Sequence, residues 1–507
     1  MKLNNILQAA RLFLLALLIH SPFAQANTEA APNKITYRVK PAYRDSLNMQ
    51  VSFRYKSDQD GKLVLRYEND SWGDKNIFDC IGSFKVEPEP ANISFMRDSS
   101  LIIIQTEPNQ LTGISYTIKQ DFNEPLKNYH RYRPIIQQEY FHLLGMRLFI
   151  TPDELFGDDT DTAVVEIIWD TPAPGTIFHS SFGSGLHQEL ELTRVMLYAS
   201  YFVGGDFRRY QYDFQGQQVN FLTRGNWQTF SDSAVFELLK QTIPTHVSFW
   251  KDRLDAPFSV TLLPTFEEWT ETSKAYSIGG SGLTNSFISF ASNNAGTGLD
   301  RLVWLYNHEL LHKWIGNTIR NEAEEKQYWF SEGFTEYYAY KLMLKSKQLS
   351  LKEWVETVNR DMIVPYHNSS VNTVPNSALT LDKFWSDREY HKLPYQRGFM
   401  YALLLDQQLK QRSKGKKSLD HLMLELLQSA KNNPSLRFNH DVFKALLLKH
   451  LDARAIDDFE KHIVEGKLIA LPKELPEGLY IQTEGNAPAL KIKEQANTVK
   501  LTQHLAL

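Results

Sequence analysis

The spacing of hydrophobic residues divides the chain into three regions. From Ile35 to about Thr171, short or alternating apolar runs lie between turn residues. This pattern is typical of strands in a β-sandwich-like domain. The clearest predicted strands cover residues 63–67, 101–105, 113–118, 146–150 and 164–169.

Helices and strands alternate in the next region, which follows the breakers Pro172, Pro174 and Gly175. Apolar residues from Phe236 to Val247 recur at helical spacing, and a strand is predicted over residues 258–263. After Lys345 the apolar residues recur almost only at spacings of three and four. Helices are therefore predicted through residues 402–409, 419–426 and 443–450.

These patterns predict an α+β multidomain protein with an N-terminal β-sandwich-like domain, a mixed α/β region and a C-terminal helical domain. The predicted segments are a signal peptide (1–26), the β domain (27–174), the mixed region (175–345), the helical domain (346–471) and a tail or small appendage (472–507).

The first residues have the pattern of a secretory signal. Lys2 and Arg11 precede an apolar run over residues 12–19, and the small-residue site Ala24-Gln-Ala26 follows. An uncleaved membrane anchor is the alternative, but the run is short for a bilayer span. We expect an exported protein, periplasmic or extracellular, that is soluble and not stably inserted in a membrane after cleavage.

Composition narrows the chemistry. The chain has 507 residues, with 55 Lys and Arg against 59 Asp and Glu, so the net charge of −4 offers no basic surface for nucleic acid. Cys80 is the only cysteine, which excludes an intramolecular disulfide and cysteine-based metal sites. Any metal must be held by histidines and carboxylates.

The strongest motif is His308-Glu309-Leu310-Leu311-His312. A chain of this composition contains about 0.03 copies of H-E-x-x-H by chance. On a helix, His308 and His312 share one face and can both bind Zn²⁺, while Glu309 lies beside the water that the metal activates. Thr297-Gly-Leu-Asp300 is a candidate capping box for that helix, and Gly316 a candidate stop.

A catalytic zinc site needs a third protein ligand. The metzincin pattern is excluded because Ile315 and Thr318 stand at its glycine and histidine positions. The segment 328–338 reads as the start of a second helix with Glu332 in its first turns. Glu332 could return to the metal, and Glu336, one turn later, is the competing ligand.

At this point the sequence resembles the gluzincin metallopeptidases of families M1 and M61. Trp314-Ile-Gly-Asn317 is similar to the segment that follows the motif in M1 aminopeptidases, whereas residues 329–338 are closer to the glycyl-aminopeptidase-like M61 form. The resemblance covers roughly residues 176 to 470. It implies a thermolysin-like catalytic domain over 175–345, one Zn²⁺ per chain and peptide or protein substrates.

The resemblance also implies roles for single residues. It assigns Glu332 as the third ligand, although 19 residues separate it from His312 where M1 has 18. Pro394-Tyr-Gln-Arg-Gly398 is similar to the segment whose tyrosine stabilises the oxyanion, which implies that role for Tyr395.

One departure from the families concerns the substrate. Before the zinc helix, Gly282 to Asn285 occupy the strand where the families carry a glutamate that pairs with the free amino terminus of the substrate. Thr284 stands at that position, with Asn285 next. Gly282, Thr284 and Asn285 are therefore candidate substrate-binding residues, with weakened recognition of the substrate amine.

The sequence thus favours an exported zinc peptidase that is aminopeptidase-like but less dependent on a free amino terminus. The alternative is a catalytically weak or inactive peptide-binding or assembly protein on the same scaffold. A lipid-mediator or epoxide hydrolase has no residue in its favour here.

Overall fold

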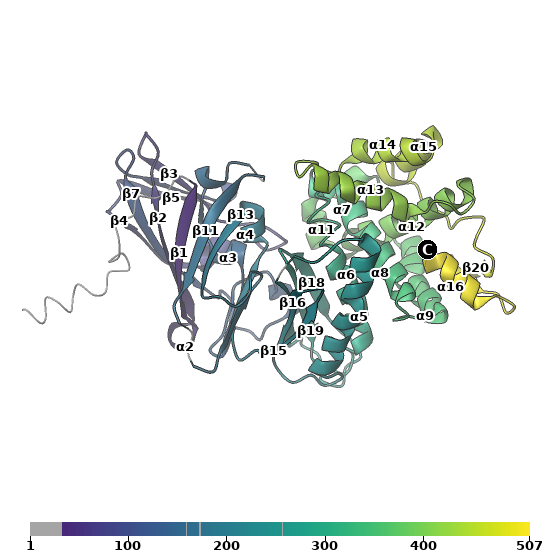
Figure 1. Ribbon diagram of the computed structural model, residues 1–507, viewed down its shortest axis with the longest axis horizontal. Helices are drawn as coiled ribbons and strands as arrows, with labels where there is room; N and C mark the ends of the chain where they lie inside the picture. Colours follow the sequence, from purple (N-terminus) through teal and green to yellow (C-terminus); the bar gives the residue numbers. More distant parts are fainter. Residues whose placement is uncertain (1–32, 159, 172–173, 256, 507) are drawn as a thin grey trace, which may run out of the picture. The chain divides into compact units, whose positions relative to one another are not determined.

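The computed structural model describes residues 33–506 apart from 159, 172–173 and 256, so the predicted signal peptide lies outside the described residues. The chain forms two compact units (Figure 1). One runs up to Glu124 and continues over Tyr132–Phe207, and the other contains Pro125–Arg131 and Arg208–Leu507. The α+β multidomain fold class is confirmed.

The first unit is built from three sheets. The six-stranded sheet has the order β13 (His187–Thr193), β11 (Thr162–Trp169), β1 (Lys34–Ala42), β2 (Asn48–Lys56), β7 (Leu111–Lys119) and β4 (Ile81–Glu87). The second sheet has the order β10 (Thr151–Pro152), β3 (Lys62–Arg66), β6 (Leu101–Gln105) and β5 (Asn92–Met96). The third has the order β12 (Ile177–Ser180), β14 (Tyr201–Gly205), β9 (Tyr140–Leu144) and β8 (Ile135–Ile136).

Four of the five strands predicted in this region are confirmed by β3, β6, β7 and β11. The prediction of a strand over residues 146–150 is wrong, because the helical turn α3 (Gly145–Leu148) occupies most of it and only then does β10 begin. All the side chains of α3 are buried. A short, fully buried apolar run has no periodicity that separates a strand from a helical turn.

Short helices complete the first unit. They are α2 (Tyr43–Ser46), α4 (Arg194–Tyr198) and the 3₁₀ turns η1 (Ile77–Cys80), η2 (Arg97–Ser99) and η4 (Glu154–Phe156).

The second unit contains a five-stranded sheet. Its order is β15 (Arg208–Phe214), β16 (Gln217–Thr223), β17 (Phe258–Thr265), β19 (Ser286–Ser292) and β18 (Ile278–Leu283). The central strands β16, β17 and β19 run parallel, whereas β18 is antiparallel to β19 and forms the outer edge. This edge will matter for the site because β18 packs on the helix that carries the histidine motif.

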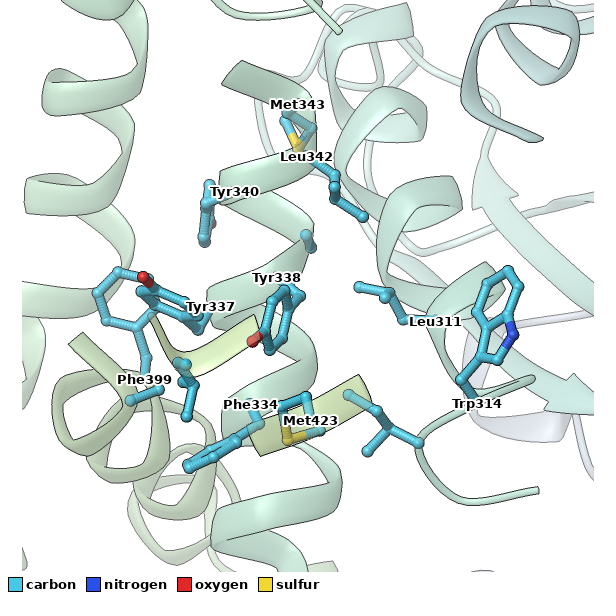
Figure 2. Packing of buried hydrophobic residues seen from close by; sticks show 14 of the residues in the cluster. Leu311, Trp314, Phe334, Tyr337, Tyr338, Tyr340, Leu342, Met343, Phe399 and Met423 are labelled. Carbon is cyan, nitrogen blue, oxygen red and sulfur yellow. The ribbon is translucent and has the colours of Figure 1, made fainter. Parts of the chain in front are cut away.

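Helices α5 (Asp232–Trp250) and α6 (Leu299–Leu311) lie beside this sheet (Figure 1), and α5 and β17 confirm the helix and strand predicted there. Behind α6 lies α8 (Gly333–Lys345), whose side chains are buried over most of its length. Figure 2 shows α8 between Leu311 and Trp314 on one side and Phe399 on the other. The helix is buried on nearly all sides, as expected for a helix in the middle of a core.

The remaining helices form the rest of this unit, and all of them except α7 lie after Lys345, where they confirm the predicted helical periodicity. They are α7 (Glu324–Ser331), α9 (Leu351–Val358), η5 (Asn359–Ile363), α10 (Val364–Asn368), η6 (Asn376–Ala378), α11 (Leu381–Ser386), α12 (Arg388–Arg412), α13 (Leu419–Asn432), α14 (His440–His450), α15 (Ala453–Phe459) and η7 (Glu460–Val464).

The last residues are packed onto these helices. The hairpin of β20 (Leu479–Glu484) and β21 (Ala487–Ile492) is followed by α16 (Thr498–Ala506), and Leu490 and Leu501 join the same apolar core. Across the described ranges, the structure contains no helix with the length and hydropathy that a membrane span requires.

Candidate metal centre

Helix α6 presents the two motif histidines to one point. His308 lies in its last turn and His312 at its C-cap, and their Nε2 atoms are 3.2 Å apart. The helix begins after Gly298 without a side-chain cap, so the predicted capping box at Thr297 is wrong; the Thr297 hydroxyl contacts Ser292 instead. The helix also ends before Gly316, yet the i, i+4 spacing still brings the two imidazoles together.

Glu332 completes a triangle with the two histidines. It lies at the junction of α7 and α8, so a helix already precedes it, in contrast to the predicted helix start. Its Oε2 lies 3.3 Å from Nε2 of His308 and 3.8 Å from Nε2 of His312. Burial raises the pKa of Glu332, but the nearby His312 and His308 outweigh burial and hold it at about 2, so the carboxylate is an anion at neutral pH.

The triangle fits a zinc ion. Tetrahedral coordination at normal Zn–N and Zn–O distances places ligand atoms about 3.4 Å apart, close to the three separations observed. Within the described part of the chain, these three residues are the one group of histidine and acidic side chains whose ligand atoms converge in this way. Two histidines and a carboxylate leave a fourth position open, as a catalytic zinc site requires.

Glu336 is not a fourth ligand but holds a ligand in place. Its Oε1 lies 3.2 Å from Nδ1 of His308, on the side of the ring away from the metal position, and the indole N–H of Trp304 donates to its Oε2 at 3.0 Å. The Nδ1 atom of His312 lies 3.1 Å from the carbonyl oxygen of Ile315. Nδ1 of His312 thus faces a carbonyl acceptor and Nδ1 of His308 lies within ion-pair distance of a carboxylate, and both rings turn Nε2 toward the metal position.

Glu309 lies beside the ligands, almost fully buried. Its carboxylate accepts the backbone N–H of Gly282, while its Oε2 is buried and has no hydrogen-bond partner among the described residues. Burial raises the pKa of Glu309 to about 7. A carboxyl group of this pKa can accept and return a proton near neutrality, and an unpartnered buried oxygen is suited to bind a water molecule.

The glycines of β18 let the strand lie directly on α6. A Cβ atom at Gly282 would stand 2.4 Å from Cβ of His312, and one at Gly280 would stand 2.7 Å from Oε1 of Glu309. Any side chain at these positions would push the strand off the helix. Thr284 and Asn285 form the tight turn that follows, with Asn285 in the left-handed region at a φ of 51°.

Tyr395, on α12, reaches the same centre. Its hydroxyl hydrogen-bonds the carboxylate of Glu332, and its ring lies 6.0 Å from the ring of His308. Two glycines make this approach possible: a Cβ atom at Gly398 would stand 1.9 Å from the carbonyl oxygen of Trp329, and one at Gly333 would stand 2.3 Å from Cα of Gly398. The close crossing of α12 with the α7–α8 junction thus brings Tyr395 to the third ligand.

The structure brings together the predicted ligands, Glu309, Gly282 and Tyr395. It also reveals contacts around the ligands that the sequence did not predict, such as the hydrogen bond from Trp304 to Glu336. No sequence pattern could predict these contacts, because each of them forms only when the chain folds. For Glu336, the spacing of four from Glu332 placed it near the site, but gave no role beyond that of a competing ligand.

Residues 284–435 match the family model for the peptidase family M1 domain. Leukotriene A-4 hydrolase from Xenopus laevis is 28% identical over 134 residues, which are 25% of this chain and 21% of that protein. Leucine aminopeptidase 2 from Yarrowia lipolytica is 27% identical over 143 residues, 26% of this chain and 21% of that protein. The matches thus span about a fifth of the length of these curated relatives.

Solved structures share the fold over most of the chain. An aminopeptidase N family protein from Idiomarina loihiensis has a TM-score of 0.69 at 16% identity, covering 88% of this chain and 79% of that one. An M1 zinc metallopeptidase from Deinococcus radiodurans has a TM-score of 0.52 at 14% identity, covering 87% and 95%.

The fold is similar to that of M1 metallopeptidases, and His308, His312 and Glu332 form a zinc site of the gluzincin class. Within that class, residues 284–435 are similar to the domain of peptidase family M1. The predicted resemblance to M1 and the predicted zinc ligands are thereby confirmed.

Proposed function

We propose that this protein hydrolyses peptide bonds in a zinc-dependent reaction. The observation that supports this most directly is the ligand triangle, with three ligand atoms 3.2 to 3.8 Å apart beside the buried carboxylate of Glu309. The set contains every group that hydrolysis at a zinc site requires from the protein. The leucine aminopeptidase and the M1 zinc metallopeptidase among the similar proteins support this class of reaction.

Each residue of the site has a separate proposed role in hydrolysis. His308, His312 and Glu332 would hold the zinc ion, which would supply a Lewis acid for water activation and for polarising the substrate carbonyl group. Glu309 accepts the proton of the attacking water on its unpartnered oxygen and returns it to the leaving amine. Tyr395 donates its phenolic hydrogen to the carbonyl oxygen as that oxygen becomes negative.

The outer strand β18 is the proposed binding strand for the peptide. An extended substrate adds to the edge of the sheet at Gly282, and the turn residues Thr284 and Asn285 meet the end of the substrate. Thr284 offers a hydroxyl and no charge where the resembled families have a glutamate. We therefore expect cleavage of N-acetylated peptides as well as of peptides with a free amino terminus.

The position of Glu336 supports the expectation that no substitute for that glutamate comes from this residue. Glu336 is 1% exposed and lies against His308 and Trp304, so it cannot turn to meet a substrate amine without exposing both partners. The neutral side chain of Thr284 and the burial of Glu336 therefore both support the proposal that the substrate amine is weakly recognised.

Export is the remaining part of the proposal. Lys2, Arg11, the apolar run over 12–19 and Ala24-Gln-Ala26 support a cleavable signal and a mature chain that begins at Asn27, in the periplasm or outside the cell. Amino-terminal sequencing of the protein from a cell fraction tests this part independently of any activity.

Glu309→Gln tests the mechanism. The variant keeps the shape of the side chain and all three ligands, so it should retain about one zinc per chain and lose most of its turnover, about 100-fold or more, because the proton acceptor is gone. Zinc content and peptide cleavage mapped by mass spectrometry are the measurements. Full turnover in this variant would contradict the role of Glu309. Zinc-loaded wild-type protein that binds peptides and cleaves none would favour the peptide-binding alternative.

A further inference from the structure

The side chain of Tyr395 packs outside the main apolar core of the second unit. A separate small cluster of Tyr328, Leu379 and Phe384 lies beside it, and Tyr395 is half-buried against this cluster. The ring of Phe384 on α11 stacks on the ring of Tyr328 on α7, with centroids 4.2 Å apart. The proposed oxyanion donor therefore takes its apolar support on this side from a small cluster and not from the core.

The helix α12 lacks one backbone hydrogen bond next to Tyr395. Pro394 lies inside the helix and has no N–H, so no helical hydrogen bond can run from residue 394 to the carbonyl oxygen of Tyr390. A proline inside a helix weakens the helix locally. We therefore expect a neighbouring side chain to supply part of the support that Tyr395 needs.

His391 lies one turn before Tyr395 on the same helix. Residues four apart are neighbours on one helix face, and the two rings are 5.6 Å apart at 37°. Nδ1 of His391 lies 3.2 Å from the carbonyl oxygen of Phe384, and the rings of these two residues are 4.6 Å apart. His391 thus joins Tyr395 to the cluster that α11 contributes to.

The contact with Phe384 also fixes the state of the imidazole. A carbonyl oxygen can only accept, so Nδ1 of His391 carries the hydrogen of this bond. Burial lowers the pKa of His391 below its usual value, so the ring is neutral at pH 7. A neutral ring with one tautomer and a backbone anchor keeps a single orientation, which is what the support of another side chain requires.

Tyr395 also borders the metal site. Its ring lies 6.0 Å from the ring of His308 at 22°, and its hydroxyl hydrogen-bonds the carboxylate of Glu332. Tyr395 thus has one imidazole of the metal site and one of its own helix as ring neighbours. Within the described residues, no ring contact, hydrogen bond or ion pair joins His391 to a metal ligand. Replacement of His391 should therefore act on Tyr395 and leave the ligands in place.

We propose that His391 is a positioning residue for the reaction. Its ring, tied to α11 through the carbonyl oxygen of Phe384, holds the phenol of Tyr395 where it can donate to the carbonyl oxygen of the substrate. This inference rests on the proposed function, in which Tyr395 stabilises the oxyanion. His391 acts on the rate through Tyr395, because a small displacement of a catalytic group weakens the contact made in the transition state.

The experiment measures steady-state cleavage of one N-acetylated peptide by the zinc-loaded full chain. His391→Leu keeps a side chain of similar size but cannot hydrogen-bond the carbonyl oxygen of Phe384. We expect kcat to fall about tenfold, with KM, zinc content and thermal midpoint near those of the wild type. His391→Asn places an amide N–H near the position of Nδ1. It should recover part of the lost kcat, and it serves if His391→Leu folds poorly.

A double variant tests whether His391 acts through Tyr395. Tyr395→Phe removes the hydroxyl and keeps the ring, and it should lower kcat by itself. If His391 acts by placing that hydroxyl, adding His391→Leu to Tyr395→Phe should lower kcat no further. A full additional tenfold loss in the double variant would overturn the inference, since His391 would then act independently of Tyr395.

A phosphinic peptide gives a readout besides turnover. Its tetrahedral phosphorus carries oxygens where the oxyanion forms, so its inhibition constant reports the contact with Tyr395. The constant should rise about tenfold in His391→Leu, in parallel with the fall in kcat. An inhibition constant equal to that of the wild type would contradict a role in placing Tyr395.

His462→Leu is the matched control. Nδ1 of His462 on η7 lies 2.9 Å from the carbonyl oxygen of Lys467, and among the described residues His462 has no contact with Tyr395. The variant removes the same kind of bond and should keep the kcat of the wild type. An unchanged kcat in His391→Leu beside an impaired Tyr395→Phe overturns the inference alone. If wild-type protein cleaves no peptide, the peptidase function itself fails and the inference falls with it, which is a distinct result.

Discussion

On the helix side of the catalytic centre, the ligands His308 and His312 each have a second contact, to Glu336 and to the carbonyl of Ile315. On the strand side, β18 contributes glycine backbone and the neutral turn that contains Thr284. The helix side thus fixes charged groups in one arrangement, while β18 itself lies close to the helix and carries no charged side chain.

This difference separates two requirements of a peptidase. The chemistry of hydrolysis needs a rigid set of ligands and a buried proton acceptor, and the helix side retains all of them. The proposed choice of substrate depends on the side chains beside β18. A substitution at a single residue there, such as Thr284, would change the charge that the substrate meets without disturbing the metal ligands. The following predictions act on one side at a time, from the largest effect to the smallest.

Removal of one metal ligand should abolish both zinc binding and turnover. Glu332→Ala leaves two histidines, which cannot hold zinc against competing chelators. We expect loss of stoichiometric zinc after dialysis against a chelator that the wild type withstands, together with loss of turnover, measured by elemental analysis and peptide cleavage. Glu237→Ala, on the surface of α5, should keep its zinc. Retained zinc in Glu332→Ala would show that another carboxylate is the ligand.

The buried His246, which contacts helix α6 on the side away from the metal position, should make the free energy of unfolding depend on pH. His246 is fully buried and donates from Nε2 to Oδ1 of Asn307, the neighbour of His308, at 2.8 Å. Burial lowers the pKa of His246 to about 4 from 6.5. The unfolded chain therefore takes up the proton first, so the stabilisation is complete above about pH 6.5 and falls as the pH drops toward 4, by about 3 kcal/mol in all.

His246→Gln keeps a donor for Asn307 and cannot titrate. Its free energy of unfolding, measured by denaturant in the presence of a chelator so that zinc release plays no part, should depend less on pH between 6.5 and 4 than that of the wild type. The same slope in both proteins would show that His246 is not the titrating group.

The second contact of His308 should tune the affinity for zinc. Glu336→Gln keeps the size of the side chain but replaces the charged acceptor of His308 by a neutral amide. Such changes next to a metal ligand weaken binding by about 10- to 100-fold. Competition with a chromophoric chelator measures the dissociation constant, and an unchanged value would contradict the role of Glu336 as a positioning residue.

The smallest predicted effect is a change in substrate preference caused by a substitution next to β18. Thr284→Glu restores a carboxylate at the turn and should raise the preference for unblocked over N-acetylated peptides by about tenfold, while zinc affinity stays the same. Thr284→Gln has the same shape without the charge and should not do so. A wild-type enzyme that strictly requires a free amino terminus would mean that another acid binds the amine.

The elements with strong periodicity could be read from the sequence. The helix α5 and the strands β3, β6, β7 and β11 carry their pattern in consecutive residues, and the H-E-x-x-H spacing places two ligands on one face of α6. The turn at residues 145–148 and the helix before Glu332 could not be read, because a buried apolar run and a polar helix start lack a distinctive period.

By itself, the sequence determined the ligands His308, His312 and Glu332 and placed Glu309, the proposed proton acceptor, beside them, since local spacing and family motifs carry these residues. Only the tertiary structure decided the contacts made by residues far apart in the chain. It directed Glu336 to Nδ1 of His308 and brought the 3₁₀ turn η3 (Asn128–His130) to Ser277, just before β18. The reason is physical: helical spacing fixes neighbours within one element, whereas the packing of different elements is set by the close approach of their backbones.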